Sequence, residues 1–114
     1  MHEYSIVSAL VEQVALHAAP RQARVQRVHV AIGEQAGVDI ELLRTAFMTF
    51  RAGTACDGAE LTTRAVAAEW RCPGCDRPLT RGAILRCPSC GRPARLAAGD
   101  EIILERIELE VPDV

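Results

Sequence analysis

Apolar residues between positions 5 and 18 recur at intervals of three or four: Val7, Leu10, Val11, Val14 and Ala18. These intervals place them on one side of a helix, because an α-helix turns once in about 3.6 residues. Glu12 and Gln13 fall on the opposite side, and Pro20 ends the pattern. The segment therefore predicts an amphipathic helix that begins almost at the amino terminus.

A second pattern alternates with a period of two over residues 25–32. One set is Gln26, Val28, Val30 and Ile32, and the other is Val25, Arg27, His29 and Ala31. Alternation of this kind predicts a half-buried strand whose more polar face carries Arg27 and His29.

The remaining periodic segments predict one more helix and two more strands. Asp39 suits the N-cap of a helix that Gly53 ends, with Leu42, Leu43, Ala46, Phe47 and Phe50 on one side. Residues 60–70 predict a strand. Residues 101–111 are rich in β-branched side chains and predict the last strand, although their alternation is imperfect.

This order of elements gives an α/β class with mixed α+β character. Two helices packed on a three-stranded mixed sheet would bury both apolar patterns, and a cysteine-rich insert separates the second strand from the third. We expect two domains in these 114 residues: residues 1–70 plus 98–114 form the α/β domain, and residues 71–97 form a small zinc-ribbon or zinc-knuckle module.

Charge divides the chain in the same place. The net charge is -2, but residues 71–97 hold six arginines against Asp76 alone, so the insert carries +5 and the remainder -7. No apolar run approaches the roughly 20 residues that span a bilayer. The start lacks the basic region of a signal peptide. We therefore expect a soluble, cytoplasmic protein without a membrane partner.

The insert contains two Cys-Pro-x-Cys pairs: Cys72 with Cys75, and Cys87 with Cys90. Two intervening residues let a tight turn aim both sulfurs at one ion, and four thiolates form the tetrahedral shell of structural zinc. The insert has few apolar residues, so metal binding must supply the energy that folds it. Eleven residues separate the pairs, fewer than the about 15–20 of common four-cysteine templates, and we expect a small hairpin through residues 79–85.

Other metals and chemistries stay open for these cysteines. Iron uses the same ligand set, and zinc is favoured because nothing suggests electron-transfer partners or an aromatic shield. A redox pair is disfavoured because such motifs occur singly at a helix start. The fifth cysteine, Cys56, stands alone in a loop and is expected to be a packed or partly exposed thiol.

The amino terminus offers a second metal site. The amine of Met1 and the backbone nitrogen and imidazole of His2 can close adjacent chelate rings on one ion. A fourth donor, from the Glu3 amide or a recruited side chain, would complete a planar field that favours Ni(II) or Cu(II) over Zn(II). Copper would win on affinity alone, so selectivity for nickel would depend on supply. Taken by itself, the tripeptide is also explained as an incidental histidine near a frayed end.

The motifs together resemble the HypA/HybF family of hydrogenase-maturation nickel metallochaperones. They are MHEYSIV at the start, Gly33-Glu34 after the first strand, Ala46-Phe47 in the second helix, the two CPxC pairs, and Gly99–Glu101 before the closing strand. The resemblance covers essentially the whole chain.

The resemblance implies a nickel carrier that acts without catalysis. It implies His2 as the nickel ligand, helped by the Met1 amine and the amides of His2 and Glu3, with zinc on the four cysteines. It also implies delivery of Ni(II) to the precursor of the [NiFe]-hydrogenase large subunit, together with the GTPase HypB. Members of the family occur as monomers and as homodimers.

Three other classes of function are weighed on the residues alone. A nucleic-acid-binding zinc ribbon is supported by the +5 insert, and opposed by the acidic body and the lack of aromatic residues in the insert. An adaptor would dock partners through its zinc ribbon and leave the amino terminus inert. An enzyme is the weakest alternative, because four cysteines leave no open position on zinc and no catalytic constellation stands out. We expect no nucleic-acid partner, and we expect His17 and His29 to be surface or partly packed residues.

Overall fold

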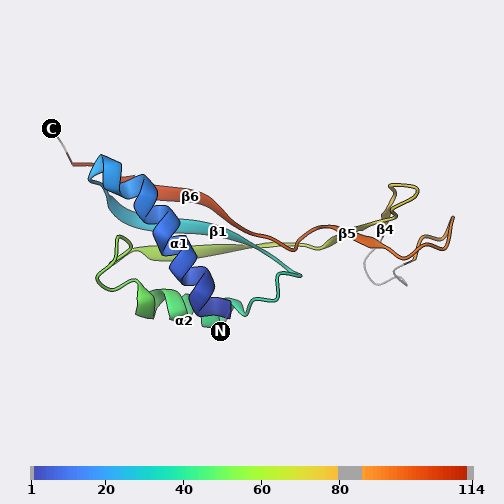
Figure 1. Cartoon of the computed structure of the whole chain (residues 1–114), viewed down its shortest axis with the longest axis horizontal. Helices are drawn as coiled ribbons and strands as arrows, with labels where there is room; N and C mark the ends of the chain where they lie inside the picture. The colour runs from blue at the N-terminus through green and yellow to red at the C-terminus, as the bar shows by residue number, and fades with distance from the viewer. Residues whose placement is uncertain (1, 80–85, 113–114) are drawn as a thin grey trace. The chain divides into compact units, whose positions relative to one another are not determined.

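A computed structural model of the chain describes residues 2–79 and 86–112. Its elements run in the order α1 (His2–Ala18), η1 (Ala19–Arg21), β1 (Arg24–Gly33), α2 (Ile40–Phe50), β2 (Glu60–Val66), β3 (Glu69–Arg71), β4 (Pro78–Leu79), β5 (Arg95–Ala98) and β6 (Ile102–Glu110). Figure 1 traces this order from blue to red. Most of the hairpin expected through residues 79–85 lies outside the described residues.

The long strands form a three-stranded sheet in the order β2-β1-β6. Residue numbers rise together along β1 and β2 but run oppositely along β1 and β6. The contacts that give these directions are Arg27 with Glu60, His29 with Thr62, Gln26 with Glu110, and Gly33 with Glu101. One pair of strands is therefore parallel and the other antiparallel, which confirms the predicted mixed sheet.

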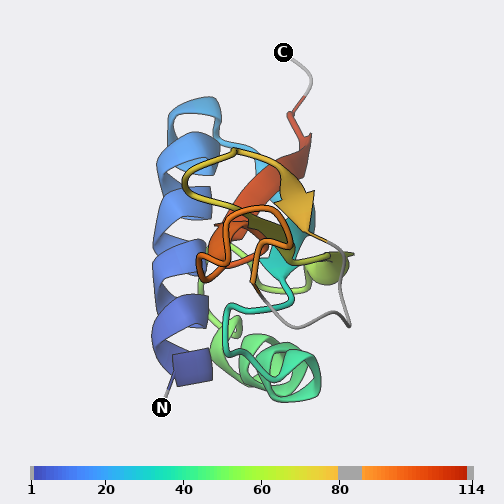
Figure 2. The same cartoon turned by 90° about the vertical axis from the view of Figure 1, so that its right-hand side faces the viewer.

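Helices α1 and α2 pack on this sheet (Figures 1 and 2). The predicted apolar positions of α1 are all buried, at 6% exposure or less. The sheet and α2 contribute further fully buried side chains: Val28, Val30, Ile32, Leu43, Ala46 and Phe47. The two apolar periodicities thus meet in one core, as the helix and strand patterns predict.

Three predicted placements are wrong in detail. Leu42 is 53% and Phe50 37% exposed, because the buried stripe of α2 is narrower than the predicted one. Gln26 is exposed while Val25 is buried, so the alternation of β1 shifts by one residue at its start. The predicted buried face of β1 is therefore observed only from Val28 onward.

The predicted strand over residues 60–70 is interrupted. It divides into β2 and β3, with Ala67 and Ala68 between them. There the backbone of Gly99 crosses so closely that a Cβ on Gly99 would lie 2.6 Å from the Cα of Ala68. Gly99 also has a φ of +95°, which favours glycine. The tight crossing explains why the strand cannot continue unbroken.

Gly33 meets Gly99 at the same crossing. A Cβ on Gly33 would lie within 2.3 Å of the carbonyl group of Gly99. The N–H of Gly33 donates to the Glu101 carbonyl at 2.8 Å, and the N–H of Gln35 donates to the Gly99 carbonyl at 2.7 Å. The Gly33-Glu34 and Gly99–Glu101 motifs, far apart in sequence, are therefore one structural feature.

A second, smaller sheet has the order β4-β3-β5, which the sequence did not predict. Trp70 pairs with Leu79 on one side and with Leu96 on the other. By its contacts the chain divides into two compact units, one of residues 1–31, 38–64 and 103–114 and the other of residues 32–37 and 65–102. Across the described residues, no helix is long and apolar enough to cross a membrane.

Candidate metal centre

Two copies of one octapeptide pattern, Arg-Cys-Pro-x-Cys-x-Arg-Pro, build the cysteine site. They occupy residues 71–78 and 86–93, here called the first and second cysteine turns. In both turns the N–H of the first cysteine donates to the carbonyl of the second arginine, at 3.0 Å in one and 2.9 Å in the other. The residue after the second cysteine has a positive φ in both, 54° at Asp76 and 73° at Gly91. The two turns therefore share one backbone conformation.

The four sulfurs lie together. All four Sγ atoms are within 4.8 Å of one another. The Sγ atoms of Cys72 and Cys90 are 3.3 Å apart, and those of Cys75 and Cys87 are 4.0 Å apart. Zn–S bonds of about 2.3 Å in a tetrahedron require sulfurs about 3.8 Å apart, so this donor set fits such an ion.

Hydrogen bonds from backbone amides lower the pKa of two of these thiols. The backbone N–H groups of Cys90 and Ser89 lower the pKa of Cys87 to about 6. The backbone N–H of Cys75 likewise lowers the pKa of Cys72. In contrast, the neighbouring sulfur of Cys72 raises the pKa of Cys75 to about 12. A bound cation offsets this mutual effect of the neighbouring sulfurs, because a thiol that coordinates a metal loses its proton.

Two of the three residues predicted to bind nickel, His2 and Glu3, lie at the start of α1. Met1 lies outside the described residues, and His2 is the first residue of α1. The Glu3 carboxylate lies 3.5 Å from the N–H of Asp39. Asp39 caps α2, because its own carboxylate accepts the N–H of Leu42 at 3.1 Å. Glu3 therefore connects the amino terminus to the start of α2.

His29 has polar partners at both ring nitrogens. Its Nδ1 lies 2.5 Å from the Thr62 hydroxyl, and its Nε2 bonds the Glu108 carboxylate. Arg27 and Arg106 pair with the same carboxylate at 3.5 and 3.3 Å. His29 is thus a partly packed histidine that links three strands, as expected.

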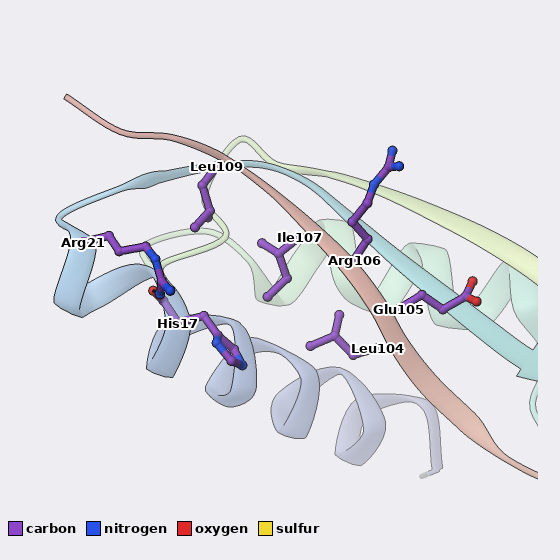
Figure 3. A pocket seen from close by; sticks show the side chains of 7 residues that line it. All are labelled: His17, Arg21, Leu104, Glu105, Arg106, Ile107 and Leu109. Atoms are coloured by element: carbon purple, nitrogen blue, oxygen red, sulfur yellow. Dashed lines mark hydrogen bonds between the residues drawn. The ribbon is translucent and has the colours of Figure 1, made fainter. Parts of the chain in front are cut away.

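A surface hollow of about 340 Å³ lies beside the end of α1 (Figure 3). His17 and Arg21 line one side, and Leu104, Ile107 and Leu109 of β6 point into it. None of the described lining residues is a predicted metal ligand. The hollow therefore does not contribute to the candidate metal centre.

Sequence reasoning missed two sets of contacts near the predicted sites. One is the contact of the Glu3 carboxylate with the backbone N–H of Asp39. The other is made by the pair Arg77 and Arg92, which lie against the cysteine turns. The signal for this pair was the repeated arginine that follows each Cys-Pro-x-Cys unit, although these arginines entered the prediction only through the +5 charge of the insert.

A protein-family model spans almost the whole chain. Residues 1–109 match the model described as "Hydrogenase/urease nickel incorporation, metallochaperone, hypA". This match includes the amino terminus, both glycine motifs and all four clustered cysteines. The chain belongs to the HypA family. The resemblance found in its motifs is confirmed.

Individual relatives agree with this assignment. A hydrogenase maturation factor HypA from Shewanella sp. (strain MR-7) is 39% identical over 99% of this chain and 98% of its own. One from Wolinella succinogenes is 38% identical over the same shares of the two chains. The similarity therefore covers 98% of each of these two HypA proteins.

Solved HypA structures have the same fold. The solution structure of the Ni metallochaperone HypA from Helicobacter pylori superposes with a TM-score of 0.73 at 31% identity, over 96% of this chain and 98% of that one. A second solution structure of a HypA protein gives a TM-score of 0.78 at 33% identity, over 96% and 97%. The predicted fold class is confirmed by these structures.

Membership of the HypA family decides the class of function. The protein is a metallochaperone for nickel incorporation in hydrogenase maturation, and it is not an enzyme. A nucleic-acid-binding ribbon or a simple adaptor would explain the arginines and the four clustered cysteines but not this match.

Proposed function

We propose that this HypA protein binds Ni(II) at its amino terminus and transfers it to the precursor of the [NiFe]-hydrogenase large subunit. The observation that carries the proposal is the family match from residue 1 to residue 109. The GTPase HypB is the proposed partner in delivery. We place the protein in the cytoplasm, where it acts as a monomer or a homodimer.

The proposed nickel ligands are the Met1 amine, the His2 imidazole and backbone nitrogen, and the Glu3 amide. Nitrogen donors in a plane suit Ni(II) better than Zn(II). The contact of the Glu3 carboxylate with the Asp39 N–H supports this arrangement, because it ties the chelating tripeptide to a second helix. An anchored tripeptide loses less conformational freedom when it binds the ion.

The proposed resident metal is zinc, held by Cys72, Cys75, Cys87 and Cys90. The spacing of the four sulfurs and the lowered pKa of Cys87 support a closed tetrathiolate site. Zinc there would be structural, since no coordination position stays open. We further propose that residues 71–97 are the zinc module and that the rest of the chain forms the nickel-binding domain.

Titration of Ni(II) into two forms of the protein tests the nickel site. One form has the native terminus and the other carries a single glycine ahead of Met1, with zinc content measured in both. We expect the extension, and His2→Ala, to abolish tight nickel binding while zinc stays at one per chain. The matched control is His17→Ala, which removes an imidazole from the other end of α1. If the native, glycine-extended and His2→Ala proteins bind nickel equally, the proposed site is wrong.

A further inference from the structure

The second arginine of each cysteine turn reaches the opposite turn. Arg77, from the first turn, donates from Nη1 to the Ser89 hydroxyl of the second turn at 3.0 Å. Arg92, from the second turn, lies over Gly74 of the first, where a Cβ would stand 2.4 Å from its Nη1. Ser89 and Gly74 are equivalent, because each is the variable residue between the two cysteines of its turn. The crossing is therefore reciprocal.

The first arginine of each turn behaves differently. Arg71 donates to the Asp76 carbonyl at 3.0 Å, and Arg86 donates to the Gly91 carbonyl at 3.0 Å. Each of these bonds closes its own turn. The repeat thus assigns two tasks to its two arginines, one within a turn and one between the turns.

We propose that Arg77 and Arg92 are positioning residues that hold the two cysteine turns together and thereby set the affinity of the four thiolates for zinc. This inference rests on the proposed zinc site. It identifies what fixes the two pairs of ligands relative to each other, which the cysteine spacing leaves open.

The need for such a connection follows from how the ligands are supplied. Each turn orients its own two sulfurs through its backbone hydrogen bonds. Across the described part of residues 65–102, the fully buried hydrophobic side chains are the ligands Cys72 and Cys87 themselves. Little apolar packing therefore aligns one turn with the other. Backbone pairing of β3 with β5 joins the flanks of the turns at Arg71 and Arg95, and the side chains that cross between the turns add to it.

Charge adds to the effect. A zinc ion with four thiolates carries a formal charge of -2. Arg77 and Arg92 bring two positive charges to Ser89 and Gly74, the residues between the cysteines of each turn, and this charge is opposite in sign to that of the proposed centre. Mutation of such side chains typically costs about 10–100-fold in metal affinity.

The test is a competition titration of the full-length, metal-free protein against a zinc chelator of known affinity. We expect the double variant Arg77→Ala/Arg92→Ala to bind zinc about 10–100-fold more weakly than the wild type. The matched control is Arg95→Ala, which removes one positive charge that pairs only loosely with Asp76, at 3.9 Å. Arg77→Lys, which keeps a donor for Ser89, should restore part of the affinity lost in Arg77→Ala.

Two double-mutant cycles separate the effect of the contacts between the turns from the effect of the arginine charge. Ser89→Ala should weaken zinc binding in the wild type and have no effect in an Arg77→Ala background. Gly74→Ala displaces the Arg92 guanidinium, so its effect should likewise disappear in Arg92→Ala. The absorption spectrum of the Co(II)-substituted protein should change in Arg77→Ala/Arg92→Ala and stay as in the wild type in Arg95→Ala.

Either proposal can fail without the other. A wild type that binds no zinc removes the proposed zinc site. A wild type with one zinc per chain, whose affinity and Co(II) spectrum are unchanged in the double variant, overturns the role of Arg77 and Arg92. The helical circular dichroism signal of each variant, to which α1 and α2 contribute, verifies that the first unit remains folded.

Discussion

Gly99 is a residue at which one added methyl group has a large expected consequence. Its φ of +95° and the close approach of Ala67 and Ala68 both oppose a side chain. We expect Gly99→Ala to lower the free energy of unfolding by about 3 kcal/mol, because backbone strain of about 1–2 kcal/mol adds to a clash with backbone atoms that cannot move aside. Urea denaturation at neutral pH measures this change.

Gly37 provides the matched control. Its φ is +74°, but a Cβ there would meet nothing within 4 Å. Gly37→Ala should therefore show only the cost of the left-handed backbone, about 1–2 kcal/mol. Equal losses in the two variants would mean that the crossing at Gly99 does not limit stability.

Glu108 makes stability depend on acid pH. The hydrogen bond from His29, followed by Arg106 and Arg27, holds the pKa of this carboxyl below its usual value. The stabilisation is therefore present above the unfolded pKa of about 4.3 and is lost as the pH falls through the lower folded value. We expect Glu108→Gln to make the fall in stability between about pH 6 and about pH 3 shallower.

The measurement is the urea midpoint across this pH range, in parallel with Glu12→Gln on the exposed side of α1. Loss of the proposed zinc in acid would affect both variants alike, so the comparison isolates Glu108. If the two profiles coincide, the carboxylate cluster on the sheet makes no contribution to acid stability.

Among the elements, those fixed by local pattern were predictable. The spacing of Val7, Leu10 and Val14 was enough to predict α1, and Asp39 correctly marked the start of α2. The error at Leu42 arose because a helical pattern does not tell how wide a stripe its neighbours cover. The sequence of a long amphipathic segment is enough to predict that it is a helix. How many of its apolar residues are buried depends on the elements that pack against it.

The small sheet was not predictable in the same way. Its strands have two to four residues, and the pairing of Trp70 with Leu96 joins segments 26 positions apart. The close approach of the cysteines was predictable from spacing because one ion requires it. The reach of Arg77 and Arg92 was not, since it depends on the shape of the opposite turn.

The cap of α2 gives a prediction for an element. Asp39→Ala removes the acceptor of the Leu42 N–H, and we expect the free energy of unfolding to fall by about 1 kcal/mol. Asp39→Ser keeps a capping oxygen and should lose far less. Thermal denaturation followed by circular dichroism compares the two. A serine variant as unstable as the alanine variant would contradict the capping role.

At the scale of the whole molecule, removal of zinc should affect the two units unequally. We expect residues 65–102 to depend on the proposed zinc, because their described buried hydrophobic side chains are the cysteines Cys72 and Cys87. The first unit has its own apolar core from α1, β1 and α2. We expect a chelator to abolish hydrogen-exchange protection of the amides in β3 and β5 and to leave that of α1 and β1 intact.

Hydrogen exchange followed by mass spectrometry, with and without chelator, resolves the two sets of amides. Restoring zinc should restore protection in β3 and β5. Loss of protection in both units together would show that the zinc site stabilises the entire chain.

The burial of Cys56 has a consequence for chemical labelling. Its side chain is fully buried, and burial raises the pKa of its thiol to about 11. Alkylating reagents attack the thiolate, and zinc would occupy the other four sulfurs. In zinc-loaded protein, alkylation of Cys56 therefore requires the first unit to open around it. The rate at which one label accumulates would then report the population of the open form when reclosing is faster than alkylation, and the opening rate when alkylation is faster, without denaturant.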